Sequence, residues 1–215
     1  MTTSRTFRNL PPDKKERILE GALSEFADKG YGRASLNTIV ARVGIAKGSI
    51  FQYFTDKSGL FRHVFDYAVD KVKDHLRKLR QESRGQDVFT RLHLSLLAGL
   101  DLLEEHPRLF RLYLHTLFES DIPFRTTLLQ SVLAFGRDYI LELLQEGQDQ
   151  GQLDPELDLE LAAFVVEAVL ERYLVARALE HMDPGLGLHR AQRRRAQELA
   201  GQMVEILRRG LGSGR

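Results

Sequence analysis

Apolar residues recur every three to four positions along nearly the whole chain of 215 residues. Such spacing places them on one face of a helix, whereas a half-buried strand would show strict alternation, which no segment does. Beyond the first third of the chain, the helical pattern repeats over Val88–Glu105, Arg108–Ser120, Asp121–Gln150, Leu159–His181 and Arg190–Leu211. The pattern therefore predicts an all-α protein.

The segment Ser35–Phe54 contains two short helical patterns separated by Gly44. Ser35 can cap the first helix, and a left-handed glycine lets the chain leave that helix without strain. The buried side of the second helix is predicted to be Ile50, Phe51 and Phe54. Its other side is then Lys47, Gly48, Ser49, Gln52 and Tyr53. Two short helices joined by a tight glycine turn are typical of a helix-turn-helix, whose second helix can enter a DNA major groove.

A further helix is predicted on either side of this segment. Asp13 and Glu16 have the spacing of a capping box, and the apolar stripe that follows them continues to Gly30, which is expected to end the helix. After Thr55, a longer apolar stripe runs to about Arg80. The first helix would brace the helix-turn-helix, and the second would link it mechanically to the rest of the chain.

The string Gly44–Phe54, followed by Asp56-Lys57, resembles the DNA-binding domain of the TetR family of transcriptional regulators, as does Gly30-Tyr31 ahead of Ser35. The resemblance covers roughly the first third of the chain. Two positions depart from the commonest pattern of the family: Ala46 stands where a serine is frequent, and Phe51 where a tyrosine is frequent. Each departure removes a hydroxyl group that could contact a phosphate.

The resemblance implies an N-terminal three-helix helix-turn-helix domain, joined by a long fourth helix to a C-terminal helical domain for ligand binding and dimerisation. We expect a flexible arm at residues 1–12, the DNA-binding domain at 13–58, the connecting helix at 59–84 and the C-terminal domain at 85–211. Arg5 and Arg8 of the arm could reach a minor groove, although a frayed terminus is the favoured interpretation. The tail from Gly212 is expected to be disordered.

Candidate DNA contacts cluster at the helix-turn-helix. Backbone N–H groups at Lys47 and at the side-chain-free Gly48 can approach a phosphate, and Gln52 can read an adenine edge. With Gln52, Ser49 and Lys47 are the candidates for base recognition. The resemblance implies backbone contacts by Tyr53 and Lys57. The full set is Ser35, Thr38, Lys47, Gly48, Ser49, Gln52, Tyr53 and Lys57. The alternative is that Ser35 is only a cap and Lys57 only a solvated charge.

Charge is distributed unevenly along the chain. Residues 1–85 contain 17 Lys and Arg against 10 Asp and Glu, whereas residues 86–215 contain 14 against 20. A basic N-terminal part attached to an acidic remainder is typical of a phosphate-binding module joined to a domain that does not bind DNA. By itself the imbalance is weak support, because charged surfaces are normal for soluble domains.

The segment Leu159–Leu179 is apolar nearly all round, so a helix there needs cover on every side. The resemblance implies that the last two helices pack against those of a second copy as a four-helix interface. A homodimer also suits a helix-turn-helix, which usually reads two half-sites. The candidate interface residues are Val166, Leu170, Leu174, Leu199, Met203 and Leu207. The alternative is a helix in the core of one chain.

The family senses small molecules in a cavity among its middle helices, so the resemblance implies an effector pocket here. Candidate lining residues are Leu96, Leu100, Leu114, His115, Phe118, Leu129, Val132, Phe135, Tyr139, Phe164, Glu167 and Arg172. Core packing is the alternative for each apolar one. Glu167 and Arg172 interrupt an apolar helix, so they either pair with groups in the chain or orient a ligand. The lining favours a hydrophobic effector.

Several kinds of chemistry have no support in the sequence. The chain has no cysteine, which excludes disulfides and thiolate metal sites, and its seven histidines form no cluster at metal-ligand spacing. His115 and Glu119 are four residues apart and are predicted to be a surface pair. We find no nucleophile–base pair, so we predict no catalytic residue, no metal, no cofactor and no enzymatic activity. The run Arg193–Arg195 is explained by a solvated helix face.

No apolar run reaches the ~18 residues of a membrane-spanning helix, and the N-terminus lacks an apolar signal region, which predicts a cytoplasmic protein. The leading hypothesis is a dimeric transcriptional regulator, a repressor, that binds a palindromic double-stranded DNA operator and is released by a small hydrophobic effector. One alternative is an all-α small-molecule-binding protein or enzyme in which DNA binding is secondary. Another is non-specific DNA packaging, which explains the acidic C-terminal part poorly.

Overall fold

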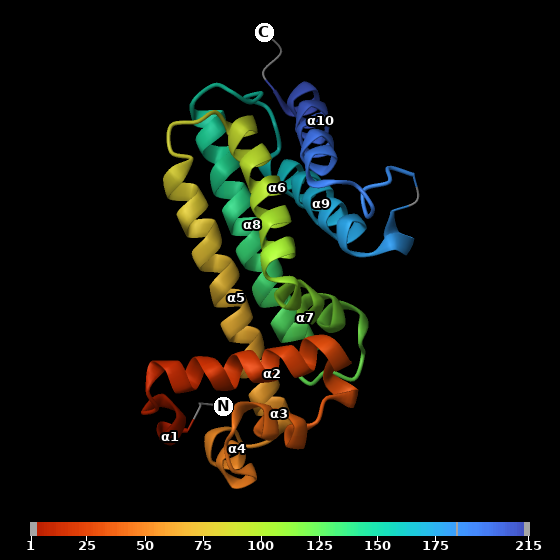
Figure 1. Ribbon diagram of the computed structural model, residues 1–215. Coiled ribbons are helices and arrows are strands. Elements are labelled where there is room, and N and C mark those ends of the chain that lie inside the picture. Colours follow the sequence, from red (N-terminus) through yellow and green to blue (C-terminus); the bar gives the residue numbers. More distant parts are fainter. Residues whose placement is uncertain (1–3, 184, 213–215) are drawn as a thin grey trace. The chain divides into compact units, whose positions relative to one another are not determined.

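The computed structural model of the protein describes residues 4–183 and 185–212 (Figure 1). In chain order its elements are α1 (Arg5–Arg8), α2 (Pro12–Arg33), α3 (Leu36–Val43), α4 (Lys47–Tyr53), α5 (Lys57–Glu82), α6 (Val88–Glu105), α7 (Pro107–Phe118), α8 (Arg125–Asp149), α9 (Leu159–Ala178), the 3-10 turn η1 (Glu180–Met182) and α10 (Arg193–Leu211). The described residues contain no β-strand, only one isolated bridge between Leu153 and Gly212. The predicted all-α fold is confirmed.

The chain forms two compact units. The N-terminal unit comprises Met1–Lys73 and His106–Val132, and the C-terminal unit comprises Asp74–Glu105 and Leu133–Arg215. Helices α5 and α8 therefore contribute residues to both units. Helix α7 belongs with the N-terminal unit, although the sequence placed it in the segment 85–211. The sequence does not show this grouping, because α7 contacts a helix that lies more than 70 positions earlier in the chain.

In the N-terminal unit, helices α2 to α5 surround an apolar core that includes Ile18, Phe26 and Phe61, all essentially inaccessible to solvent. Helices α2 and α3 approach very closely at Gly21. A Cβ atom on Gly21 would lie 2.2 Å from Cγ1 of Val43, so only glycine allows this approach. The tight contact fixes the position of the first helix of the helix-turn-helix on the surface of α2.

The N-terminal arm is more ordered than the sequence predicted. Residues 1–3 lie outside the described residues, but Arg5–Arg8 forms the short helix α1, which the side chain of Ser4 caps. The ring of Phe7 is buried, with its centroid 4.8 Å from that of Phe54. Burial of this one aromatic side chain stabilises a segment that the sequence predicted to be a flexible arm.

Helix α2 also differs from its prediction at its C-terminal end. Gly30 was expected to end this helix, but the chain kinks there, with φ 71° and ψ 171°, and helical turns continue to Arg33. Glycine is required at this kink, because the backbone is in the positive-φ region and a Cβ atom would lie 2.0 Å from the Glu119 carboxylate. The kink therefore coincides with the contact between α2 and α7.

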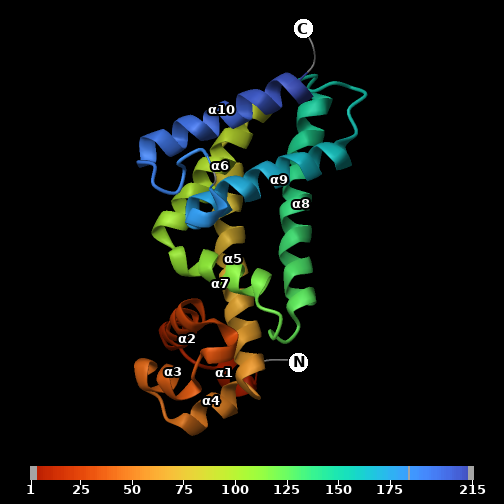
Figure 2. The same ribbon diagram turned by 90° about the vertical axis from the view of Figure 1, so that its right-hand side faces the viewer.

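The C-terminal unit is built around a core to which α6, α8, α9 and α10 contribute. Figure 2 shows α9 and α10 crossing α6, and buried side chains of α6 and of both crossing helices meet in one apolar cluster. Tyr173 of α9 is fully buried there, and its hydroxyl donates a hydrogen bond to the carbonyl of Ala196 at 3.0 Å. Gly212, where the predicted disordered tail begins, is ordered and forms the bridge with Leu153, while residues 213–215 of that tail lie outside the described residues. None of the described helices is both long and apolar enough to span a bilayer.

Candidate nucleic-acid interface

The two short helices α3 and α4 and the turn between them have the geometry that the sequence predicts. Ser35 caps α3 by accepting a hydrogen bond from the backbone N–H of Thr38 at 3.5 Å. Gly44 follows α3 in the left-handed conformation, with φ 68° and ψ 43°, and lets the chain turn directly into α4. The predicted cap and the predicted glycine turn are both confirmed.

A buried carboxylate that sequence reasoning missed holds the start of α3. Glu25 of α2 is only 4% exposed, and its Oε1 accepts a hydrogen bond from the backbone N–H of Ser35 at 3.2 Å. Its Oε2 lies 3.7 Å from Nη2 of Arg42, on the last turn of α3. Glu25 thus ties both ends of α3 to α2. The available signal was an acidic residue on the otherwise apolar face that contains Ala22 and Phe26.

The outward face of α4 differs at two positions from the predicted one. Phe51 was predicted to be buried and is 49% exposed, whereas Tyr53 was predicted to be exposed and is only 6% exposed. Tyr53 is covered by α1, because the centroid of the Phe7 ring lies 5.8 Å from that of the Tyr53 ring. Lys47, Gly48 and Gln52 are exposed and Ser49 is partly exposed, as predicted. The outward face of α4 therefore consists of Lys47, Gly48, Ser49, Phe51 and Gln52.

Lys57, at the start of α5, has partners within the chain. Its Nζ donates a hydrogen bond to the carbonyl of Gly32 at 3.1 Å and lies 4.8 Å from the centre of the Tyr31 ring. Burial lowers the pKa of the Lys57 ammonium. The side chain therefore helps to hold the end of α2 beside α5, and it is not the freely solvated charge of the alternative interpretation.

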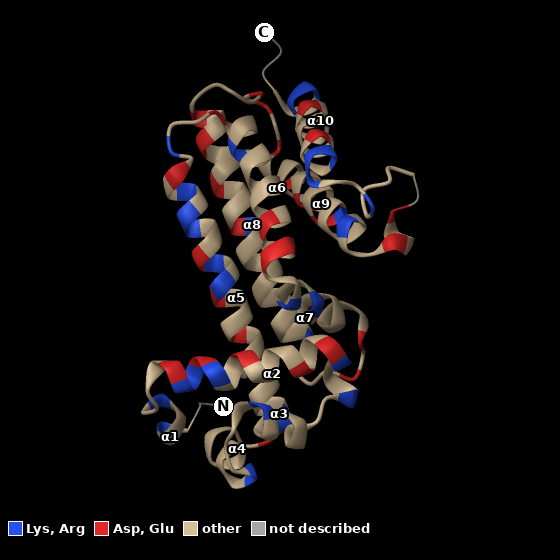
Figure 3. Cartoon of the chain, viewed as in Figure 1, with Lys and Arg blue, Asp and Glu red and all other residues tan. Residues whose placement is uncertain are grey.

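Few charges lie on the two short helices. Figure 3 shows α3 and α4 mostly in tan, the colour of residues without charge, whereas basic and acidic positions alternate along α2 and α5. Lys47 is the one basic residue of α4. The surface at Gly48 is open to solvent, since a Cβ atom there would meet nothing within 4 Å. The outward face of α4 is thus a mixed polar and apolar surface with one cation at its N-terminal end.

Helix α7 is joined to α2 by a polar cluster of His115 and Glu119. Nδ1 of His115 lies 2.6 Å from Oε1 of Glu119, and Nε2 of His115 lies 3.2 Å from the carbonyl oxygen of Ala27. Oε2 of Glu119 accepts a hydrogen bond from the backbone N–H of Tyr31 at 3.0 Å. The two residues were predicted to be a surface pair, but they connect α7 to the C-terminal turns of α2.

The predicted effector-pocket residues are distributed over several places in the structure. Leu96 and Leu100 are buried in the core, His115 and Val132 belong to the other unit, and Phe118 and Phe164 are exposed. The hydroxyl of Tyr139 bonds Ser95, and Glu167 lies against Gly136, where a Cβ atom would be 3.7 Å from its Oε1. Phe135, also a candidate, is partly exposed on α8. Of these candidates, Arg172 lines a cavity of about 620 Å³ in the C-terminal unit.

The predicted dimer residues lie deeper in the chain than an interface requires. Val166, Leu199 and Leu207 are buried in the core of the C-terminal unit, and Leu170, Leu174 and Met203 are partly buried against it. The exposed apolar residues of α9 and α10 are Leu161 at 62%, Phe164 at 68%, Val165 at 39% and Ile206 at 71%. We call these four residues the exposed apolar patch.

Among the described residues, no group of three or more His, Asp or Glu side chains could hold a metal ion. A brace helix, a capped short helix, a left-handed glycine and a second short helix with an outward face define a helix-turn-helix DNA-binding protein. Comparison with known proteins identifies its family. Residues 18–64 match the family described as bacterial regulatory proteins, tetR family.

Individual relatives agree with this match. The probable acrEF/envCD operon repressor of Escherichia coli K12 is 25% identical over 160 residues, which cover 71% of this chain and 70% of that protein. The transcriptional activator FasR of Mycolicibacterium smegmatis is 30% identical over 119 residues, covering 55% of this chain and 52% of that protein. A TetR family regulator from Chloroflexus aurantiacus has a similar solved structure, with 30% identity, a TM-score of 0.71 and coverage of 99% and 100% of the two chains.

The chain belongs to the TetR family of transcriptional regulators. The predicted membership is thereby confirmed, as is the prediction that the protein is not an enzyme, because the proteins of this class regulate transcription.

Proposed function

We propose that the protein represses transcription by binding a palindromic DNA operator as a homodimer, and that a small hydrophobic effector releases it. The helix-turn-helix carries this proposal. Helix α3 is fixed on α2 by Glu25 and by the close contact at Gly21, so α4 presents a defined outward face. A rigidly positioned second helix is what reading of a major groove requires.

Within this face, we assign base recognition to Lys47, Ser49 and Gln52, and phosphate contacts to Ser35, Thr38 and Gly48. Long and short polar side chains on one exposed helix face can reach base edges, and an open glycine lets the phosphate backbone approach closely. Tyr53 and Lys57 lie behind the face, where their partners within the chain position α4 and the end of α2. Their contribution to DNA binding is therefore mainly indirect.

The exposed apolar patch supports dimerisation. Leu161, Phe164 and Val165 lie on adjacent turns of α9, and solvent exposure of three large apolar side chains on one helix is costly unless a partner covers them. A second copy of the chain is the partner that a two-fold operator demands. Leu170, Leu174 and Met203, which are partly buried, are then the margin of this interface.

The Escherichia coli relative is named a probable repressor, and we propose that this chain also represses transcription. We place the DNA-binding domain at 13–58, the connecting helix at 59–84 and the effector-binding and dimerisation domain at 85–211, with α7 of this last range packed in the N-terminal unit. The protein acts in the cytoplasm, where operators lie. Helices α5 and α8 are the elements that belong to both compact units, so they are the routes by which an effector would alter DNA binding.

A gel shift tests the proposal directly. The purified protein is titrated against the DNA upstream of its own coding region and against random duplex of equal length, at two salt concentrations. We expect a preference of at least ~10³-fold for the upstream DNA. Equal affinity for both duplexes would favour non-specific packaging and would contradict a sequence-specific regulator. Native mass spectrometry of the same sample reports whether the protein is a dimer.

A further inference from the structure

The short helix α1 is fixed against α4 by an aromatic anchor and a backbone hydrogen bond. The ring of Phe7 is buried, and its centroid lies 4.8 Å from that of Phe54 and 5.8 Å from that of Tyr53. The backbone N–H of Ser4 donates to the carbonyl of Tyr53 at 3.4 Å. Figure 1 shows α1 beside α4, and the two helices are in direct contact. The position of α1 relative to α4 is therefore set by packing.

Helix α1 also adjoins the outward face of α4. Ser4, the cap of α1, lines a hollow of about 290 Å³ together with Phe51 and Gln52, which belong to that face. Both residues lie towards the C-terminal end of α4, whereas Lys47 and Gly48 form its N-terminal end. A duplex placed against the outward face would therefore lie close to α1 at the C-terminal end of α4.

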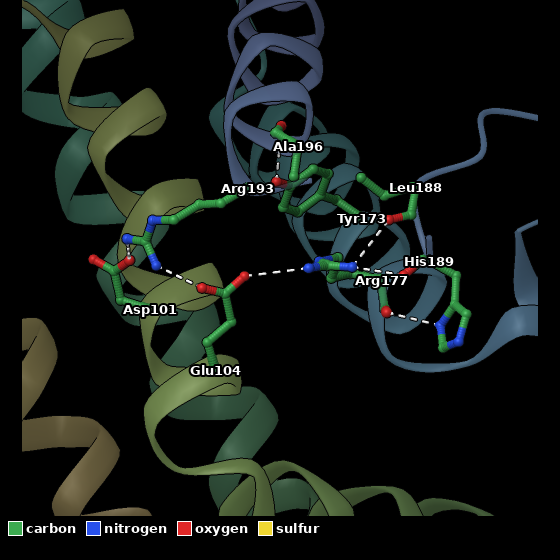
Figure 4. A network of polar contacts seen from close by, with 8 residues as sticks. All are labelled: Asp101, Glu104, Tyr173, Arg177, Leu188, His189, Arg193 and Ala196. Atoms are coloured by element: carbon green, nitrogen blue, oxygen red, sulfur yellow. Dashed lines mark hydrogen bonds and ion pairs between the residues drawn. The ribbon is translucent and has the colours of Figure 1, made fainter. Parts of the chain in front are cut away.

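Two arginines of α1 are without partners in the described part of the chain. Arg5 and Arg8 are three residues apart, so they share one face of the helix, and both are exposed. Neither forms an ion pair or a side-chain hydrogen bond with a described residue, and α1 contains no acidic residue (Figure 3). Elsewhere in the chain carboxylates neutralise arginines, as Asp101 and Glu104 do for Arg193 (Figure 4). The two guanidinium groups of α1 are thus available to an anionic partner.

The helix-turn-helix itself offers few available cations. Helices α3 and α4 contain one basic residue each, Arg42 and Lys47. Nη2 of Arg42 lies 3.7 Å from the buried carboxylate of Glu25, and Lys57 donates to the carbonyl of Gly32. Affinity for duplex DNA at physiological salt depends on several contacts between cations and phosphates. Beside the single available cation of α4, α1 supplies two more.

We propose that α1 is a second DNA-contacting element, in which Arg5 and Arg8 bind phosphates of the duplex next to the segment that α4 faces. Phosphates are favoured over the minor groove because α1 is a helix fixed on α4 and not an extended arm that can follow a groove. Phosphate contacts do not depend on base sequence. That these contacts set the register of α4 on an operator rests on the proposed function.

The salt dependence of DNA binding tests this proposal. Fluorescence anisotropy measures binding of the wild type and of Arg5→Gln/Arg8→Gln to the upstream DNA and to random duplex, from about 50 to about 200 mM salt. We expect the variant to reduce the slope of log K against log salt by about 2 on both duplexes. Its loss of affinity should accordingly be about tenfold smaller at the higher salt concentration than at the lower.

The matched control is Arg84→Gln/Arg209→Gln, which makes the same charge change at two exposed positions of the C-terminal unit. We expect this control to leave the slope unchanged. The proposal fails if Arg5→Gln/Arg8→Gln has the wild-type slope, or if the control lowers the slope by as much. It also fails if the loss is confined to A·T-rich duplexes, since that result would indicate insertion into the minor groove.

Ethylation interference on the upstream DNA locates the contacts. Ethylation of a phosphate removes its charge, so it should weaken binding of the wild type at phosphates that Arg5 and Arg8 contact. Those positions should no longer interfere in Arg5→Gln/Arg8→Gln, whereas all other positions should remain. An identical interference pattern in both proteins would contradict a phosphate contact by α1.

Phe7→Ala tests whether the anchor matters. Without a fixed helix, replacement of Arg5 and Arg8 should cost less affinity than in the wild type, because the arginines must be ordered on binding. Equal cost in both backgrounds would show that they act as a flexible tail and would overturn a fixed second element. Phe7→Leu, which keeps an apolar side chain, is the control. Circular dichroism melting checks folding, and if Phe7→Ala does not fold, the salt slope of the arginine pair decides alone.

The random duplex separates this proposal from the proposed function. If the wild type shows no preference for its upstream DNA but the slope on random duplex falls by about 2 in the variant, the regulator proposal fails and the α1 contact stands. If the upstream DNA is preferred and the slope does not change, the α1 contact fails and the regulator proposal stands. Absence of binding to either duplex would overturn both.

Discussion

The buried carboxylate of Glu25 is the single residue on which the position of α3 depends most. It accepts a hydrogen bond from the backbone N–H of Ser35, just before α3, and pairs with Arg42 on the last turn of α3, so it restrains both ends of that helix. Buried polar groups that lose their partner cost more than the hydrogen bond contributed.

We predict that Glu25→Ala lowers the free energy of unfolding by about 1–3 kcal/mol, because the Ser35 N–H and Arg42 lose their acceptor. Glu25→Gln keeps an acceptor oxygen for Ser35 and should cost less. Urea denaturation at pH 7 measures both. The exposed helical substitution Glu198→Ala serves as the control. A loss from Glu25→Ala no larger than that of the control would show that this carboxylate does not hold α3.

On the outward face of α4, Lys47 and Gln52 should differ in how they affect DNA binding. Lys47→Ala should weaken binding to every duplex and reduce the slope of log K against log salt by about 1, because a cation beside the phosphates is removed. Gln52→Ala should weaken binding to the operator by about 1–3 kcal/mol and leave random duplex nearly unaffected. Fluorescence anisotropy at three salt concentrations distinguishes them. The assignment of Lys47 to base reading predicts an additional operator-specific loss for Lys47→Ala.

Glu146 provides a pH-dependent contribution in the C-terminal unit. Its hydrogen bond with Arg91, at 2.5 Å, and its pairing with Arg80 hold the pKa of this carboxyl below its ordinary value. A carboxyl with a depressed pKa in the folded state stabilises the fold above its unfolded pKa and loses that contribution as the pH falls through its folded pKa.

We therefore expect Glu146→Gln to destabilise the protein at pH 7. Between pH 5 and pH 3, the free energy of unfolding should decrease less in Glu146→Gln than in the wild type. Urea denaturation across this pH range gives the comparison. Glu205→Gln, at an exposed position of α10, is the control for a general charge effect. The same pH dependence in wild type and Glu146→Gln would contradict a stabilising role for this pair.

At the scale of elements, two glycines play different parts in the helix-turn-helix. Gly44 needs its positive φ, while a side chain there would meet nothing within 4 Å. Gly21 has an ordinary helical backbone, while a side chain there would overlap Val43. Backbone conformation limits the first position, and the distance between helices limits the second.

We predict that Gly21→Ala costs about 1–3 kcal/mol through overpacking and that Gly44→Ala costs about 1–2 kcal/mol through backbone strain. The two should respond differently to Val43→Ala. This second substitution removes the overlapping methyl groups, so it should recover part of the loss in Gly21→Ala but none in Gly44→Ala. Thermal denaturation of the single and double variants gives the two coupling energies. If Val43→Ala had the same coupling energy with Gly21→Ala as with Gly44→Ala, the two glycines would not be limited by different causes.

The exposed apolar patch leads to a prediction about α9. Phe164→Asp places a charge on its most exposed α9 position and should shift the dimer towards monomer by more than tenfold in dissociation constant, because an unpaired charge would be buried. Phe118→Asp is the matched control, at 61% exposure on α7. Analytical ultracentrifugation measures both. Dissociation by Phe118→Asp but not by Phe164→Asp would place the interface elsewhere.

The sequence predicted the elements of the helix-turn-helix well, because cap, glycine turn and apolar spacing are local features. It failed for Tyr53, which is covered by a distant aromatic ring on α1, and for Phe51, which is exposed on the outward face of α4. Glu25 and the pairing of His115 with the end of α2 were missed for the same reason, since both depend on partners remote in sequence. Most of the pocket and interface candidates were apolar residues of helices that the family resemblance indicated, and apolarity does not separate core positions from surface positions.

At the scale of the whole molecule, the grouping of α7 with α2 makes the N-terminal unit discontinuous along the chain. Its parts are separated by Asp74–Glu105, which belongs to the C-terminal unit. An operator-binding fragment that ends after the connecting helix at residue 84 would lack α7. The Tyr31 N–H and the Ala27 carbonyl would then lose their partners on α7, and the apolar residues beneath that helix would meet water.

Exchange of effector domains between regulators is therefore constrained by this discontinuity. A chimaera with a single junction near residue 84 would transplant α7 from another protein, without the side chains that fit the kink at Gly30. A functional hybrid of this chain needs three junctions, near residues 73, 105 and 132, and so carries its own α7 as an inserted segment. The sequence suggests a DNA-binding domain followed by a separate effector domain, but for protein engineering the two compact units alternate along the chain.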